Sequence, residues 1–223
     1  MAEATASSRL SVGRLILIPG LITLAVTVLR LVGELQQWSS VWFSRTMGTS
    51  IVGITWLAPV FGIYFALRLS KSEDQPKSFL RAIWYSLLGV LVLVVLAFAP
   101  GLLGIEHSFY GRLLYGWTIF VVGALVAWRG WPALFKTLLA YGYTARVPVA
   151  LIMFFAFRGN WGTHYDAVPP DAPALSLLPK YLWLGFFPQL VLWVAYTILS
   201  GMLVGTLVAG IARLVKLERQ ASA

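Results

Sequence analysis

Long stretches without charged residues are the feature of this sequence that most limits what it can fold into. No charged residue lies between Arg81 and Glu106, or between Lys180 and Arg213. A helix needs about 20 apolar residues to cross the hydrocarbon core of a bilayer, and both stretches are longer than that. The run from Leu91 to Leu96 does not alternate apolar with polar residues, as a strand of a membrane barrel would. The sequence therefore predicts an all-α, polytopic integral membrane protein.

Composition supports this class and removes several kinds of chemistry. Of the 223 residues, 59% are hydrophobic and 11% are charged, against roughly 45–50% and 25% in soluble proteins. The chain has no cysteine, which excludes thiolate catalysis, disulfides, iron–sulfur clusters and cysteine zinc sites. The net charge of +9 is spread between the apolar stretches rather than gathered in one patch, so a nucleic-acid partner is not expected.

The apolar stretches predict a bundle of about six transmembrane helices. The expected spans are about residues 15–35, 51–69, 81–99, 113–128, 138–157 and 183–212, with a polar head at 1–14, an external loop at 158–180 and a tail at 218–223. The fifth span contains Gly142, Arg146 and Pro148. It is either one long kinked helix from Pro132 or an interfacial helix followed by a short span. Pro188 is expected to break or bend the last span near its start.

The placement of the basic residues predicts the topology. With six spans, eleven of the seventeen lysines and arginines fall on the side of the two termini and five on the other side, and Arg146 lies within a span. Basic residues are enriched in cytoplasmic loops. Both termini are therefore expected to be cytoplasmic, in a cell (plasma or inner) membrane.

Polar residues recur along one face of the first span. Thr23, Thr27, Arg30 and Glu34 are spaced by four, three and four residues, so they share a helix face. One interpretation is an ion pair at the headgroup level, with the threonines bonded to their own backbone carbonyls. The other is a polar seam facing a water-filled or ligand-bearing cavity, because intramembrane ionisable groups usually face inward.

Arg146 is also unusual, because it lies well inside the fifth span and a charged side chain there is energetically costly to place in a membrane. Its long side chain can extend toward an interface. Alternatively it binds a carbonyl, an anionic lipid headgroup or an anionic substrate, with Tyr143 among the nearby hydroxyls.

Small residues follow one stripe of the last span. Thr197, Gly201, Gly205 and Ala209 are four residues apart, in line with Gln189 and Trp193 before them. Small residues let helix backbones approach closely. The stripe predicts helix packing, either within the chain or with a second copy or another membrane subunit.

The segment 158–166 concentrates polar and aromatic side chains between the last two spans. Such a loop either caps the bundle or binds something. His164 and Asp166 could form an acid–base pair, although a histidine and an aspartate two residues apart are common in loops.

Sequence signatures of common enzymes and nucleotide-binding proteins are missing. We predict no catalytic residue and no metal site, and no cofactor is indicated.

The first functional prediction is a non-catalytic membrane subunit or scaffold that packs through small-residue faces, with the lipid bilayer and a further copy or subunit as partners. The alternative is a small-solute permease, or the membrane-embedded binding component of a transporter. A cavity between the first and fifth spans would favour the alternative. The candidate binding residues are Thr23, Thr27, Arg30, Glu34, Tyr143, Arg146, His164 and Asp166.

Overall fold

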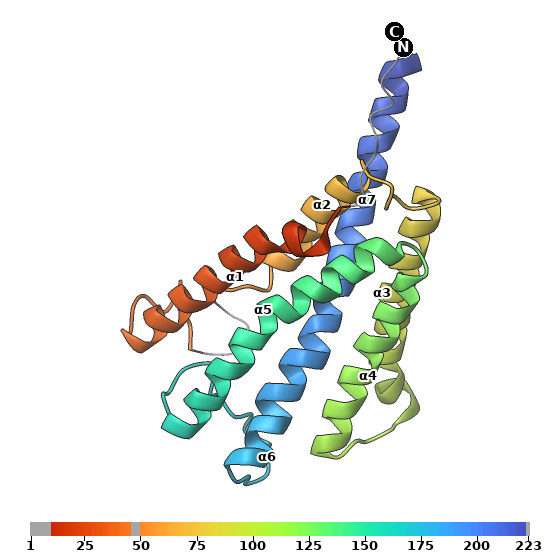
Figure 1. Ribbon diagram of the computed structural model, residues 1–223. Helices are drawn as coiled ribbons and strands as arrows, with labels where there is room; N and C mark the ends of the chain where they lie inside the picture. Colours follow the sequence, from red (N-terminus) through yellow and green to blue (C-terminus); the bar gives the residue numbers. More distant parts are fainter. Residues whose placement is uncertain (1–9, 46–49, 222–223) are drawn as a thin grey trace.

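The structure is a computed structural model that describes residues 10–45 and 50–221, and within them it is helical, with no strand. This confirms the predicted all-α class. Residues 1–9 of the predicted head and 222–223 of the predicted tail lie outside the described part of the chain. The helices are α1 (Val12–Leu35), α2 (Leu57–Leu69), α3 (Phe79–Leu103), α4 (Phe109–Trp128), α5 (Pro132–Gly159), α6 (Leu177–Tyr181) and α7 (Trp193–Ala221); two π-helical turns, η1 (Leu182–Phe186) and η2 (Pro188–Leu192), lie between α6 and α7 (Figure 1).

Within the described residues, five helices are long and apolar enough to cross a bilayer: α1, α3, α4, α5 and the continuous helix Leu177–Gln220. The sixth apolar helix, α2, has 13 residues, about 20 Å at 1.5 Å per residue. The second span was expected at 51–69, but residues 51–56 form bends and turns. Pro59 explains where the helix begins, because proline fits the first turn of a helix and disrupts an interior position.

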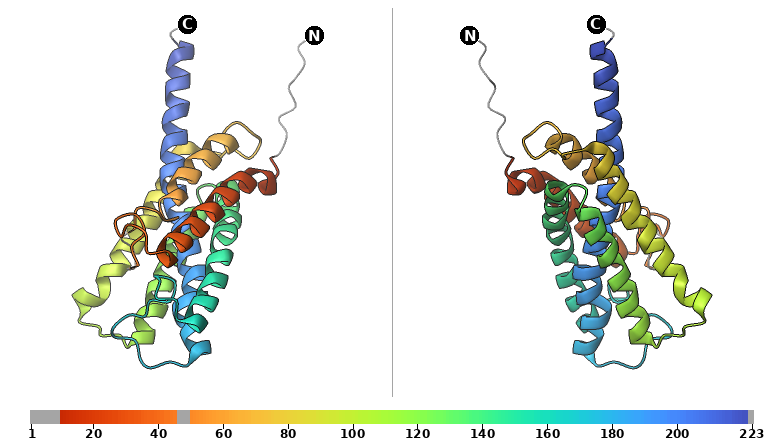
Figure 2. Two further views of the ribbon diagram at one scale, coloured as in Figure 1. Left: turned by 90° about the vertical axis from the view of Figure 1, so that its left-hand side faces the viewer. Right: turned by 90° about the vertical axis from the view of Figure 1, so that its right-hand side faces the viewer.

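With the short α2 included, the apolar helices run alternately up and down, and α1 begins at the same end of the bundle at which α7 ends (Figure 1). The helix α7 runs through the middle, in contact with α2, α3, α4 and α5. In contrast, α1 crosses the bundle obliquely, and the described parts of the connection from α1 to α2 lie level with the middle of the bundle (Figure 2).

The two helices in which proline was expected to cause a kink or a break are continuous. The helix α5 runs without interruption from Pro132 through Pro148 to Gly159, which matches the long-helix alternative for this segment. Pro188 does not break the last helix: it is the first residue of the π-helical turn η2, and η1 ends two residues before it. Proline has no backbone N–H to donate, and the wider i→i+5 hydrogen-bond pattern of a π-helical turn accommodates it within a continuous helix.

The backbones of α2 and α7 approach each other closely at glycines. A Cβ atom added to Gly62 would overlap the backbone of Gly201, and one added to Gly205 would lie 2.6 Å from the Gly62 carbonyl oxygen. Thr197 and Ala209 on the same stripe are also buried. All four predicted packing residues thus lie inside a single copy of the chain.

Candidate functional site

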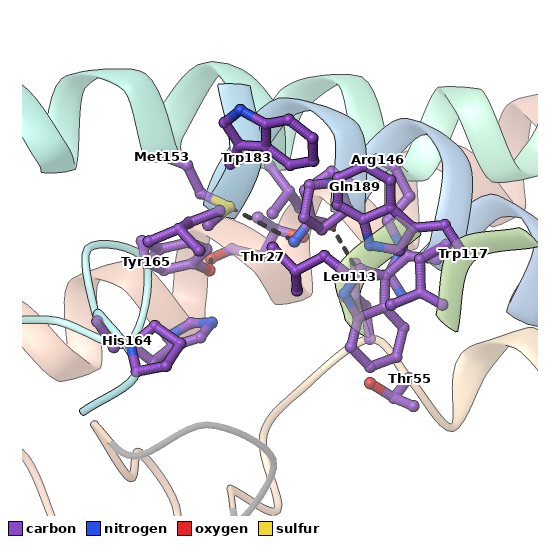
Figure 3. Close-up of a pocket in the computed structure, with 18 of the residues that line it drawn as sticks. Thr27, Thr55, Leu113, Trp117, Arg146, Met153, His164, Tyr165, Trp183 and Gln189 are labelled. Atoms are coloured by element: carbon purple, nitrogen blue, oxygen red, sulfur yellow. Dashed lines mark hydrogen bonds between the residues drawn. The ribbon is translucent and has the colours of Figure 1, made fainter. Parts of the chain in front are cut away.

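A cavity of about 310 Å³ lies between α1, α4, α5 and the π-helical turns that precede α7. Two connecting segments complete its wall: residues 54–55 before α2, and residues 164–169 after α5. Figure 3 shows these side chains converging on one space. The volume falls at the lower end of the range of about 300–1,000 Å³ that is typical of small-molecule sites.

Arg146 of α5 is the most unusual residue in the cavity wall. It is only 5% exposed. Its Nη1 donates a hydrogen bond to Gln189 Oε1 at 3.3 Å, and its Cζ lies 4.7 Å from the centroid of the Trp193 ring. Its Nε has no hydrogen-bond partner, and Arg146 makes no ion pair with any residue in the described ranges. The guanidinium is therefore held by an amide and a ring face, without a carboxylate to balance its charge.

Gln189 bridges two residues of α5, Arg146 and Met153, across the cavity wall. It lies in η2, directly after Pro188. While its oxygen accepts from Arg146, its Nε2 donates to Met153 Sδ at 3.4 Å. The amide is thereby fixed with its acceptor toward Arg146 (Figure 3).

Tryptophans supply much of the remaining wall. The rings of Trp117 and Trp183 are stacked, with centroids 5.6 Å apart and an interplanar angle of 26°. Trp193 lies beneath the Arg146 guanidinium, an arrangement that stabilises a cation through the electron-rich ring face. The cavity thus combines apolar aromatic walls with one buried positive group.

The polar seam of α1 faces the interior. Thr23 Oγ1 donates to the Pro19 carbonyl at 2.8 Å, and Thr27 Oγ1 donates to the Thr23 carbonyl at 2.9 Å. Arg30 Nε donates to Glu34 Oε1 at 2.8 Å, and Glu34 is 1% exposed. The hydroxyl bonds and the ion pair are those expected from the sequence. However, the pair is buried, and Thr27 and Arg30 reach the cavity.

The loop after α5 docks on this seam. The His164 backbone N–H donates to Glu34 Oε2 at 2.9 Å. His164 Nδ1 lies 2.6 Å from Glu34 Oε1, at ion-pair distance although out of line for a hydrogen bond. Tyr165 Oη donates to the Thr27 carbonyl at 3.2 Å. One buried carboxylate thus anchors both Arg30 and the loop that closes one side of the cavity.

Burial sets the charge state of this loop. It lowers the pKa of His164 below its ordinary value, against the opposing effect of Glu34, which raises it. Burial likewise raises the pKa of the Tyr165 phenol. Both side chains are therefore neutral at pH 7, and the loop brings hydrogen-bonding groups to the cavity without adding charge.

The structure brings only part of the predicted binding set together. Thr27, Arg30, Arg146 and His164 line the cavity, and Glu34 holds two of them. Thr23 is buried away from it, hydrogen-bonded to the Tyr141 hydroxyl at 2.8 Å. Tyr143 is 44% exposed on the outer surface.

Asp166 has a local structural role. Its carboxylate accepts hydrogen bonds from Gly162 N at 2.8 Å and from both Thr163 N and Thr163 Oγ1 at 2.7 Å. It therefore stabilises its own turn, and the carboxylate in direct contact with His164 is Glu34.

Sequence reasoning missed Gln189, Tyr165 and the three tryptophans as members of the site. Gln189 and Trp193 were placed on the stripe of the last span and interpreted as packing. A useful signal was the polar amide directly after Pro188, within a stretch that is otherwise almost entirely apolar. The rings carried no comparable signal, because buried tryptophans are also common in helix packing.

No protein-family model, curated protein or solved structure matches this chain. What the cavity can bind therefore has to follow from its own residues.

Proposed function

We propose that this chain is an integral membrane protein that binds a small solute in the cavity, as a permease or as the membrane-embedded binding component of a transporter. The observation that carries the proposal is Arg146. Its side chain is almost fully buried, makes no ion pair with the described residues and lies in the wall of a cavity of ligand size. Burying a charge in a membrane helix costs a few kcal/mol or more, so such groups usually mark a substrate path.

The scaffold function predicted from the small-residue stripe has less support. Gly201 and Gly205 are the centre of that stripe, and the space over them is filled by Leu138 of α5 and by the α2 backbone at Gly62, respectively. A partner helix on the same face would have to displace α2. The cavity next to α1 and α5 is, in addition, the feature expected of a permease.

The cavity also accounts for the short second helix. Non-helical backbone at membrane depth is tolerated where it is buried in protein or lines a water-filled space. Ile54 and Thr55, in the non-helical segment before α2, line the cavity. We propose six crossings, with α2 and this segment together making the second. The charge distribution then favours cytoplasmic termini, and we propose a cell (plasma or inner) membrane and a cavity that opens to the external side.

The absence of cysteine permits a direct test. A single cysteine at Val149, which is 5% exposed and lines the cavity, is compared with one at Leu138, which is 0% exposed on the same helix and does not line it. Water-soluble methanethiosulfonate reagents are applied from the external side of right-side-out vesicles. We expect Val149→Cys to be modified and Leu138→Cys to stay unmodified. If both remain unmodified from either side of the membrane, the cavity is not open to solutes and the proposal fails.

A further inference from the structure

We infer that the ligand of this cavity is an organic anion with a single negative charge and an apolar, aromatic body. This inference rests on the proposed function and specifies its substrate class. It follows from the charge balance of the cavity wall, from the character of the remaining wall, and from the placement of Arg146, the arginine of that wall to which no described residue supplies a balancing charge.

The charge balance gives a ligand charge of minus one. Arg30, Arg146 and His164 are the ionisable groups of the wall whose charge has to be balanced. Glu34 lies within ion-pair distance of Arg30 and His164, and it cancels the charge of Arg30. With a neutral imidazole, the positive charge of Arg146 remains.

The protein holds Arg146 in place without neutralising it. Its two close partners are the Gln189 amide oxygen and the Trp193 ring, and both are uncharged. Two buried supports of this kind fix the orientation of a guanidinium. A planar guanidinium is well suited to a carboxylate or sulfonate group, because charge-assisted hydrogen bonds are the stronger ones. An anion bound there would form an ion pair with Arg146.

The rest of the wall selects the body of the ligand. Trp117 and Trp183 present stacked rings, and Val149, Leu113 and Pro188 add apolar surface. Aromatic rings favour offset or edge contacts with another ring. A strongly hydrated inorganic anion would lose its water on entering and gain little from these walls. A neutral ring compound would leave Arg146 unbalanced, and a cationic one would be repelled by it.

The first part of the test measures charge selectivity in the full-length Val149→Cys chain in phosphatidylcholine vesicles. The probes are an anionic sulfonatoethyl and a cationic trimethylammonioethyl methanethiosulfonate. A unit charge a few ångströms away at an effective dielectric constant near 20 is enough for a rate preference of about tenfold or more. We expect the anionic reagent to be favoured by that factor, relative to the ratio of the two rates on a free thiol. Arg146→Gln should abolish the preference and Arg146→Lys should retain it. Arg158→Gln, at the exposed end of the same helix, should leave it unchanged.

The second part measures protection of the same cysteine from an uncharged methanethiosulfonate. The probes share one ring system and differ in charge: 1-naphthoate, 1-naphthamide and 1-naphthylmethylammonium. We expect protection by naphthoate, weaker protection by naphthamide and none by the ammonium. This series needs no variant at Arg146, so it decides the question even if Arg146→Gln does not fold.

The two proposals fail in different ways. If Val149→Cys reacts with no reagent, solute binding in the cavity is wrong. If it reacts with both charged reagents at a ratio that Arg146→Gln does not change, or if naphthamide protects as well as naphthoate, the cavity stands but the anionic ligand class is overturned.

Discussion

The helix α7 and the π-turn before it face two neighbouring regions that are built in opposite ways. Toward α2 the stripe carries Gly201 and Gly205, and the two backbones meet with no room for a methyl group. A few turns earlier, the same four-residue spacing places Gln189 and Trp193 on a cavity. A regular spacing therefore predicts that residues share a face, but side-chain size and polarity decide whether that face closes or stays open.

The two regions should also be destabilised by opposite kinds of substitution. The α2–α7 contact has no spare volume, so it should be sensitive to added atoms. The cavity side is held by buried polar contacts, of which Glu34 makes the most, so it should be sensitive to the loss of a charge. The following predictions test this contrast.

Replacing Glu34 should produce the largest effect. Glu34→Ala leaves the Arg30 guanidinium and the His164 backbone N–H without their acceptor. Losing one partner of a buried ion pair typically costs about 3–5 kcal/mol. We expect a loss of this size in the free energy of unfolding, measured by detergent-titrated unfolding in mixed micelles, together with faster amide exchange at His164.

The matched control is an ion pair of the segment 160–176, which connects α5 to α6 and which Glu34 anchors through His164. Asp171 pairs with Arg112 of α4 at an exposed position, where an ion pair contributes about 0–1 kcal/mol. Asp171→Asn should therefore change stability little. Equal losses for the two variants would show that burial of Glu34 is not what anchors the loop.

A single methyl group should disturb the α2–α7 contact. In Gly62→Ala, the new Cβ meets the Gly201 backbone, which cannot move aside as a flexible side chain would. Overpacking of this kind costs about 1–3 kcal/mol. Gly116→Ala on α4 is the control, because a Cβ there meets nothing within 4 Å and alanine favours a helix. If both variants unfold at the same temperature, the α2–α7 contact has room for a methyl group and the prediction is wrong.

The sequence carried more information about the α2–α7 contact, the closed region, than about the cavity, the open region. The small residues at Gly201 and Gly205 predicted close packing without any knowledge of the partner, since only small residues permit it. The charge-free stretches likewise predicted the long helices. The shortened α2 was not predicted, because mean apolarity continues through residues 51–56 while Pro59 sets where the helix begins.

The open region depends on contacts between residues far apart in the chain. Arg30, Glu34 and Arg146 were identifiable because charge within an apolar span is costly. Their partners were not, since His164 lies 130 residues after Glu34 and Gln189 lies 43 residues after Arg146. Periodicity reports which residues share a face of one helix, but it does not report which loop or helix that face will meet.

Acid should weaken the cavity side alone. Burial lowers the pKa of His164, so the folded state resists protonation that the unfolded chain accepts at about pH 6.5. Glu34 and Asp166 oppose this shift, and Arg30 adds to it. Stability from this group is complete above about pH 6.5 and falls as the pH drops below that value, by at most about 1.4 kcal/mol per pH unit.

The measurement is the free energy of unfolding at pH 7.5 and pH 5.5, for the wild type and for His164→Asn. We expect a smaller decrease on acidification in the variant. A wild-type protein that becomes more stable at pH 5.5 would mean that attraction between Glu34 and a protonated His164 outweighs burial.

The smallest expected effect concerns the second anchor of the loop. Tyr165→Phe removes the hydroxyl that donates to the Thr27 carbonyl at 3.2 Å and keeps the buried ring. A hydrogen bond of this kind contributes about 0.5–1.5 kcal/mol, so a loss in that range is expected in the free energy of unfolding. Tyr143→Phe, on the exposed face of α5, should show no loss. If the Tyr165→Phe loss stays the same size in the Glu34→Ala background, the two anchors act independently; a smaller loss there would mean that the loop docks as one unit, with Glu34 in control of both contacts.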